Sequence, residues 1–211
     1  MNEYDNEPIS GLPGVLPPGE RILWQGSPEW RALARTAFHT RLIAGYYAVL
    51  VAVAAGFAWS NGGYTGVVMT ATLGAVGVAL LHLLAWGSAR TTIYTLTNRR
   101  IVLRIGIAVP KCINLPLATL ASVDLAVRAD GTGDLPLTLT GAPRLGYLAL
   151  WPHARAWRIN RPQPMLRSVP GATTVAGLIA RACEAVSSEG RVAVADAAHA
   201  SMPSFTQAQA A

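Results

Sequence analysis

Two histidines are the most notable side chains in this sequence whose type and position could support chemistry. His82 lies inside a long apolar stretch, where a polar side chain is by default a functional candidate. Its imidazole could hydrogen-bond to a neighbouring helix, reach the membrane surface, or act as a ligand to the magnesium of a chlorin pigment. His153 lies in a segment rich in tryptophan and arginine, 151–158 (WPHARAWR).

That segment combines the residue types that are most enriched in binding hot spots. It predicts contact with a protein partner, and the alternative is a set of ordinary core tryptophans with solvated arginines. Two tryptophans near the N-terminus are candidates for the same role. The predicted partner-contact residues are Trp24, Trp30, Trp151, His153, Arg155 and Trp157.

The sequence contains no catalytic motif of the common kinds, such as GxSxG, HExxH, a P-loop or a pair of spaced carboxylates. The segment 130–134 (DGTGD) is too short for a calcium loop and lacks its final glutamate, so it predicts a tight turn. We therefore expect no enzymatic activity, no metal and no resident cofactor. Transient pigment binding at His82 is the alternative that stays open.

The elements that position these residues begin with an apolar run. Residues 42–89 contain 48 positions without Asp, Glu, Lys or Arg. One helical membrane span needs roughly 20 apolar residues, so this run predicts two spans. We place them at 42–59 and 64–89, with a turn at 60–63 (SNGG).

Basic residues flank the predicted hairpin on both outer sides, and the turn has none. This asymmetry predicts a multi-pass protein of the inner (intracytoplasmic) membrane with both termini in the cytoplasm and the turn in the periplasm. The formal charge of +6 could also indicate nucleic acid, but no nucleic-acid-binding motif is present and the hairpin favours lipid. The arginines predicted to contact anionic headgroups, or else only to enforce topology, are Arg90, Arg99, Arg100 and Arg104.

Small residues recur at every fourth position in both predicted spans, a pattern that lets helices approach closely in lipid. They could pack the two spans on each other, or they could form a face for a partner or a second copy of the chain. The predicted helix-packing residues are Ala44, Ala48, Ala52 and Gly56 in the first span and Ala71, Ala75 and Ala79 in the second.

Residues 1–26 form a predicted N-terminal arm that ends in a short strand or turn. A helix is expected at 27–41, with Ser27 as N-cap and Pro28 at its first position. Trp30, Leu33 and Phe38 belong to its apolar stripe, and arginines follow a second row. Such a helix favours the headgroup plane of a membrane, and the alternative is docking on the soluble domain.

After the second span the period of the sequence changes to that of strands. Strands are expected at 91–97, 100–105, 111–115, 120–128, 134–140 and 144–150, followed by an amphipathic helix that begins near Thr173 and buries Val175, Ile179 and Val186. The prediction is an α+β membrane protein: a two-helix transmembrane hairpin, then a small pleckstrin-homology-like (PH-like) β-barrel or sandwich at 90–186 capped by a C-terminal helix. Residues 187–211 are expected to be disordered.

Segments 4–39, 89–117, 129–139 and 147–172 resemble the photosynthetic-complex assembly proteins of purple bacteria, the PuhB family. The N-terminal arm and the segment 150–155 (LWPHAR) carry the specific part of this resemblance. It implies a non-enzymatic factor that promotes assembly of the reaction centre with its core light-harvesting antenna (RC-LH1), and self-association as a homodimer. Reaction-centre and core-antenna subunits, membrane lipids and a second copy are the implied partners, with no nucleic acid. An anionic-lipid-sensing adaptor and a bacteriochlorophyll-handling carrier are the alternatives.

Overall fold

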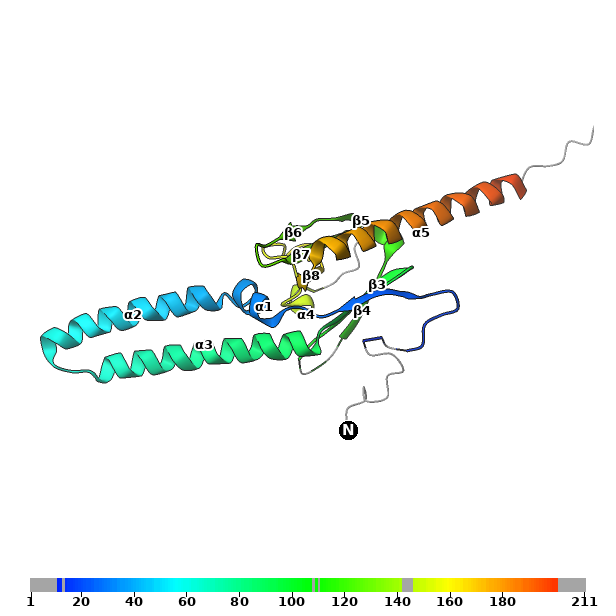
Figure 1. Cartoon of the computed structure of the whole chain (residues 1–211). Coiled ribbons are helices and arrows are strands. Elements are labelled where there is room, and N and C mark those ends of the chain that lie inside the picture. Colours follow the sequence, from blue (N-terminus) through cyan, green and yellow to red (C-terminus); the bar gives the residue numbers. More distant parts are fainter. Residues whose placement is uncertain (1–10, 13, 108, 110, 142–145, 201–211) are drawn as a thin grey trace, which may run out of the picture.

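The structure is a computed structural model that describes residues 11, 12, 14–107, 109, 111–141 and 146–200. It is an α+β chain in which two long helices form a hairpin that projects from a domain of two antiparallel sheets (Figure 1). The hairpin consists of α2 (Thr40–Asn61) and α3 (Thr65–Thr91), so both predicted helices are confirmed with slightly wider bounds. Both are long and apolar enough to cross a membrane.

The N-terminal helix differs from the prediction. Helix α1 is short (Trp30–Thr36), and Glu29 rather than Ser27 caps it by accepting hydrogen bonds from the backbone N–H groups of Arg31 and Ala32. The chain then bends at His39, whose φ of 49° lies in the left-handed region, and starts again as α2. The expected helix over 27–41 is therefore two helices with a bend between them.

The apolar face of α1 is covered by protein. Leu33, Ala34 and Phe38 pack against Ala85 and Ala89 in the last turns of α3. The apolar stripe is thus largely covered by the end of α3, and not by the sheets of the domain as in the docking alternative. A position of α1 at the headgroup plane stays a prediction. The contact with α3 also fixes α1 at the junction between the hairpin and the domain.

The first sheet has the order β1-β2-β3-β4, with all neighbours antiparallel. Its strands are β1 (Ile22–Gly26), β2 (Ile93–Thr97), β3 (Arg100–Ile105) and β4 (Lys111–Pro116). The predicted hairpin of β2 and β3 is confirmed. The end of the N-terminal arm is an edge strand of this sheet, which ties the segment before the hairpin to the segment after it.

The second sheet is built around β7 (Thr132–Leu139), which pairs with β5 (Leu120–Val123), β6 (Ala126–Val127) and β8 (Met165–Pro170). A 3-10 turn, η1 (Leu117–Thr119), leads into β5. Two expectations fail here. The strand expected at 144–150 is in its described part a one-turn helix, α4 (Tyr147–Leu150), and β8 was not expected. The turn predicted at 130–134 is confirmed for residues 130 and 131, where Asp130 accepts hydrogen bonds from Thr132, whereas 132–134 already belong to β7.

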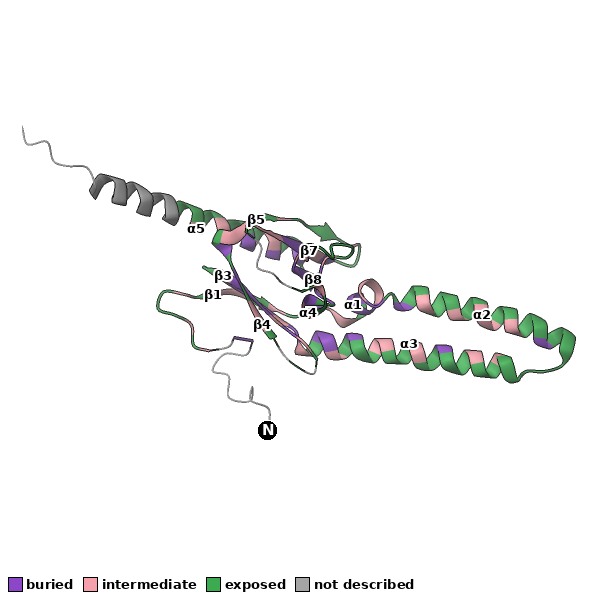
Figure 2. Ribbon diagram, turned by 180° about the vertical axis from the view of Figure 1, so that it is seen from behind, coloured by how far each residue is buried: buried purple, intermediate pink, exposed green. Residues whose placement is uncertain are grey.

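The core lies between the two sheets and helix α5 (Ala172–Ala200). Val175 and Ile179 of α5 are buried against residues such as Leu103 and Leu135. The predicted C-terminal helix is therefore confirmed, but it extends to Ala200, where a disordered tail from residue 187 was expected. Figure 2 shows buried residues concentrated in the domain and exposed residues along the hairpin.

Candidate functional site

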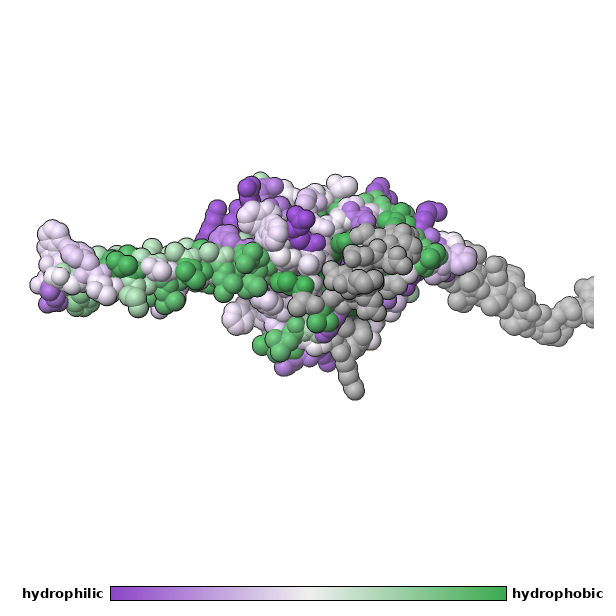
Figure 3. Space-filling view, turned by 90° about the horizontal axis from the view of Figure 1, so that it is seen from below, coloured by the Kyte–Doolittle hydropathy of each residue, from purple (hydrophilic) through white to green (hydrophobic). Residues whose placement is uncertain are grey.

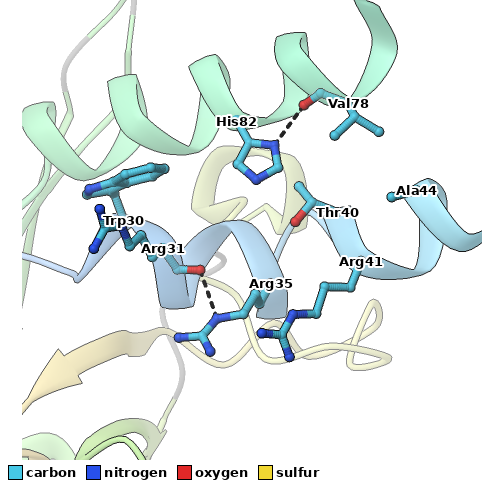
Figure 4. A pocket seen from close by; sticks show the side chains of 8 residues that line it. All are labelled: Trp30, Arg31, Arg35, Thr40, Arg41, Ala44, Val78 and His82. Carbon is cyan, nitrogen blue, oxygen red and sulfur yellow. Dashed lines mark hydrogen bonds between the residues drawn. The ribbon is translucent and has the colours of Figure 1, made fainter. Parts of the chain in front are cut away.

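A pocket of about 450 Å³ opens where α1, the start of α2 and the middle of α3 meet (Figure 4). Arginines of α1 and α2 line one side of it, and His82 of α3 lies opposite. The lining residues are Trp30, Arg31, Arg35, Thr40, Arg41, Ala44, Val78 and His82.

The bend at His39 brings these side chains together. Because α1 packs on α3, Arg31 and Arg35 lie near the level of His82 on that helix. The bend then places Arg41, in the first turn of α2, at the same opening. The sequence shows these arginines before the first span, but it does not predict that His82 lies in the same pocket. That proximity depends on the packing of α1 on α3, which is a tertiary contact.

The arginines of α1 have partly fixed positions. The guanidinium of Arg31 lies 5.3 Å from the centre of the Trp30 ring, within cation–π range. Arg35 donates through Nε to the Arg31 carbonyl oxygen at 3.1 Å, and through a terminal nitrogen to Asp130 Oδ2 at 2.8 Å. Hydrogen bonds from Thr132, with a smaller contribution from Arg35, lower the pKa of Asp130. The carboxylate therefore stays charged and holds part of Arg35.

His82 forms a hydrogen bond within its own helix. Its Nδ1 lies 2.8 Å from the Val78 carbonyl oxygen, and because a carbonyl only accepts, Nδ1 carries the proton. The other ring nitrogen points toward Thr40 in Figure 4. The expected bond to the neighbouring span is absent among the described residues. Three arginines line the same pocket as His82, so its surroundings are basic.

The four arginines predicted to contact lipid headgroups lie at two ends of the domain. Arg90 is exposed in the last turn of α3 and stacks on Trp86, and Arg104 pairs with Ile93 at the start of β2. Arg99 and Arg100 follow the far end of β2, roughly 15 Å farther from α3 at about 3.4 Å per residue. Arg100 also binds Glu20 through two nitrogens. Headgroup contact by the four arginines therefore stays a prediction, and the ion pair with Glu20 gives Arg100 a second role within the domain.

His153 is buried and belongs to a hydrogen-bond network, not to a contact surface. The Arg167 N–H lies 3.1 Å from Tyr94 Oη, which lies 2.7 Å from His153 Nδ1. His153 Nε2 lies 3.1 Å from Thr92 Oγ1. Because Tyr94 accepts from the backbone, its hydroxyl can donate to Nδ1, and a neutral His153 then donates from Nε2 to Thr92. Burial and the charge of Arg167 lower the pKa of His153 to about 3, which keeps the ring neutral.

The other predicted partner-contact residues differ in exposure. Trp157 is 94% exposed and Trp151 is 47% exposed, although Trp151 packs edge-to-face on Phe38 at 5.3 Å. Arg155 donates to Asp124 Oδ2 at 2.8 Å. Trp24 and Trp30 are half-buried and pack against the two apolar clusters of the fold. Trp157 therefore offers the largest accessible aromatic surface of the set.

The small residues of the two helices do not pack the hairpin together. All seven predicted helix-packing residues are exposed, and a Cβ added at Gly56 would meet no atom within 4 Å. The close approach of α2 and α3 is instead at Gly74, where a Cβ would lie 2.8 Å from Cγ of Tyr47. The alternative in which the ladders pack the two spans on each other is wrong, and the ladders face outward.

A family model described as "Bacterial PH domain" matches residues 40–182. A protein of Rhodobacter capsulatus named "Uncharacterized 23.7 kDa protein in puhA 5'region" is 37% identical over 207 residues, which cover 95% of this chain and 97% of that protein. No solved structure gives a significant match. The family match includes the helical hairpin as well as the sheets, and the match to the relative also includes α1 and β1.

Proposed function

Because the chain belongs to the bacterial PH domain family, we propose that it is a membrane-anchored, non-enzymatic binding module that promotes assembly of the photosynthetic reaction centre with its core light-harvesting antenna. The hairpin supplies the membrane anchor and a helical contact face. The PH-like domain supplies a cytoplasmic docking face. This role links the fold to the resemblance with the photosynthetic-complex assembly proteins.

The exposed apolar hairpin is the observation that carries the proposal. In each helix only 6% of the most apolar 18-residue window is buried within the structure. Leu73, Leu80 and Leu83 are each more than half exposed, and Figure 3 shows hydrophobic residues along the hairpin and hydrophilic ones over the domain. Such a surface is costly in water and fits a bilayer, where lipid tails cover it.

The proposed location is the inner, intracytoplasmic membrane, with the PH-like domain and both termini in the cytoplasm. Arg31, Arg35 and Arg41 lie at the domain end of α2, and Arg90 lies at the domain end of α3. The turn after Asn61 carries no charge. Basic residues retained on one side support this orientation.

The choice of partner rests on the relative and on the resemblance. The relative's name places it in the puhA 5' region, which favours a role in photosynthesis. One segment that carries the specific resemblance, 150–155, begins at the last residue of α4 and is followed directly by exposed residues 156–161, which include Trp157 and Ile159. An exposed tryptophan on a loop beside that segment suits a partner contact.

Purification of the tagged full chain from native membranes tests the proposal. Reaction-centre and core-antenna subunits should co-purify with it. Trp157→Ala should reduce their recovery, because an exposed aromatic anchor typically contributes about 2 kcal/mol. Ile159→Ala removes another exposed apolar side chain of the same loop and serves as the matched control. Recovery of neither subunit with the wild-type chain would contradict the proposal.

A strain that lacks the protein provides the second test. It should contain less reaction centre and core antenna while pigment synthesis continues, because an assembly factor acts after its components are made. Accumulation of a pigment precursor, with normal complex levels once pigment is restored, would instead indicate an enzyme or a pigment carrier.

A further inference from the structure

We infer that the pocket between α1, α2 and α3 binds the phosphate group of an anionic membrane phospholipid, whose acyl chains continue along the hairpin. The inference rests on the proposed insertion of the hairpin in a membrane. This pocket is a different site from the predicted lipid-contact arginines that follow the second span. Its basic residues come from α1 and from the first turn of α2.

The charge of the lining selects an anion. Arg31, Arg35 and Arg41 line the pocket from two helices, and none of its eight lining residues is acidic. Planar guanidinium groups bind phosphate oxygens through two parallel hydrogen bonds, which a carboxamide or carbonyl ligand does not match in strength. Asp130 engages one nitrogen of Arg35 from outside the lining and leaves the excess of positive charge in place.

Two of the three arginine side chains are already restricted in the free protein. Stacking on Trp30 restricts Arg31, and hydrogen bonds to Arg31 and Asp130 restrict Arg35, so less side-chain freedom remains to be lost on binding. In Figure 4 the side chains of Arg35 and Arg41 extend toward the same side of the pocket. His82 lies on the opposite wall, with its second ring nitrogen free of any hydrogen bond to the described residues (Figure 4).

The polarity of the pocket distinguishes a lipid from a free phosphate ion. Ala44 and Val78 line the end of the pocket that is nearer the hairpin turn. Each lies about one helical turn closer to that turn than Thr40 and His82. Ala44 is exposed, and Leu42 and Leu80 nearby in the sequence are 72% and 54% exposed. The space therefore changes from guanidinium groups to an open apolar helix surface. A phosphodiester that carries acyl chains satisfies both ends, whereas inorganic phosphate satisfies only one.

The pocket also lies at the depth of the headgroups in the proposed orientation. Trp30 borders it, and tryptophan rings prefer the membrane interface. Its arginines lie at the domain end of the hairpin, where an anionic leaflet surface contributes about 1 kcal/mol for each basic residue. A lipid held here would contact α1, α2 and α3 at once and would fix the angle between the hairpin and the domain.

Lipid retention by the purified full chain in detergent tests the inference. After delipidation, dioleoyl phosphatidylglycerol, dioleoyl phosphatidylcholine or inorganic phosphate is added, and native mass spectrometry counts bound molecules. We expect one phosphatidylglycerol for each chain, with phosphatidylcholine binding at least about tenfold more weakly. The double variant Arg31→Gln, Arg41→Gln should bind phosphatidylglycerol at least about tenfold more weakly.

The control variant Arg158→Gln, Arg161→Gln removes two exposed arginines outside the pocket and should bind as the wild-type chain does. Circular dichroism checks that both variants are folded, and Ala44→Trp, which fills the pocket and keeps its charge, should also lose the lipid. Equal retention of the two lipids, equal loss in both arginine variants, or displacement of the lipid by an equal concentration of inorganic phosphate would overturn the inference. Because no photosynthetic subunit is present, failure here is separate from failure of the assembly proposal.

Discussion

At the scale of single residues, His153 is the centre of a buried hydrogen-bond network in the domain. Its ring bonds Thr92 at the end of α3 and Tyr94 of β2, and Tyr94 in turn accepts from the backbone N–H of Arg167 in β8. Arg167 in turn donates to the carbonyl oxygens of Pro152 and Thr36, so the same network reaches the end of α1. The sequence marked His153 as special, but its role depends on partners 59 and 61 residues away, which no local pattern reveals.

The neutral state of His153 makes stability depend on pH. The unfolded chain binds a proton at this ring near pH 6.5, and the folded chain does so only near pH 3. The contribution of neutral His153 to the free energy of unfolding is therefore fully present above about pH 6.5. Below that pH, the free energy of unfolding should fall by up to about 1.4 kcal/mol for each pH unit. Denaturant unfolding of the detergent-solubilised chain at about pH 7 and about pH 5 should show a loss of about 2 kcal/mol.

The variant His153→Gln isolates this effect. Glutamine keeps a donor and an acceptor but does not titrate, so the loss of stability between the two pH values should shrink. His39→Gln removes an exposed histidine and should leave the pH dependence as in the wild-type chain. An unchanged slope in His153→Gln would show that other groups cause the acid sensitivity.

At the scale of elements, the sequence predicts what local periodicity controls. The uncharged run specifies α2 and α3, and the β-branched segment 91–97 specifies β2. The sequence does not predict those elements whose conformation or position depends on tertiary contacts. Residues 165–170 carry Arg167 in the middle of a buried strand, and a charged residue at that position is why the sequence pattern did not predict β8. Two backbone carbonyl oxygens accept hydrogen bonds from the Arg167 guanidinium and so accommodate it there.

The outward direction of the small-residue ladders could not be predicted either, because both helices carry one. Their facing depends on tertiary contacts such as the close approach of Tyr47 to Gly74. The ladder on α2 is therefore the face available for a second copy or a transmembrane partner. Ala48→Leu with Ala52→Leu should reduce cross-linked dimer or partner recovery, because added bulk prevents close helix approach in lipid.

The matched control for this prediction lies on the same helix. Val49→Leu with Val53→Leu enlarges two other exposed residues of α2 that do not belong to the ladder. Cross-linking in membranes measures both double variants. Equal cross-linking of the ladder variant and the wild-type chain would show that this face contacts only lipid.

At the scale of the whole molecule, one bend and one edge strand join the hairpin to the domain. β1 precedes the hairpin and pairs with β2, which follows it, so the sheet closes around the base of the hairpin. α1 then packs on α3 and reaches β8 through the bond from Glu29 N–H to the Ser168 carbonyl oxygen. The domain is therefore held at a fixed position relative to the hairpin and, in the proposed orientation, close to the membrane surface.

This arrangement makes the topology testable at the two ends of the molecule. With Cys112 and Cys183 replaced by serine, a cysteine at Gly62 should react with an impermeant thiol reagent in intact spheroplasts, because the turn is proposed to face the periplasm. Gly62 has a φ of 71° and open space around it, so the added side chain strains the turn slightly but meets no atom within 4 Å. A cysteine at the exposed Ser188 of α5 should react only after permeabilisation. Labelling at 188 and not at 62 in intact spheroplasts would reverse the orientation, and the arginine pocket and the docking face of the domain would then lie on the periplasmic side.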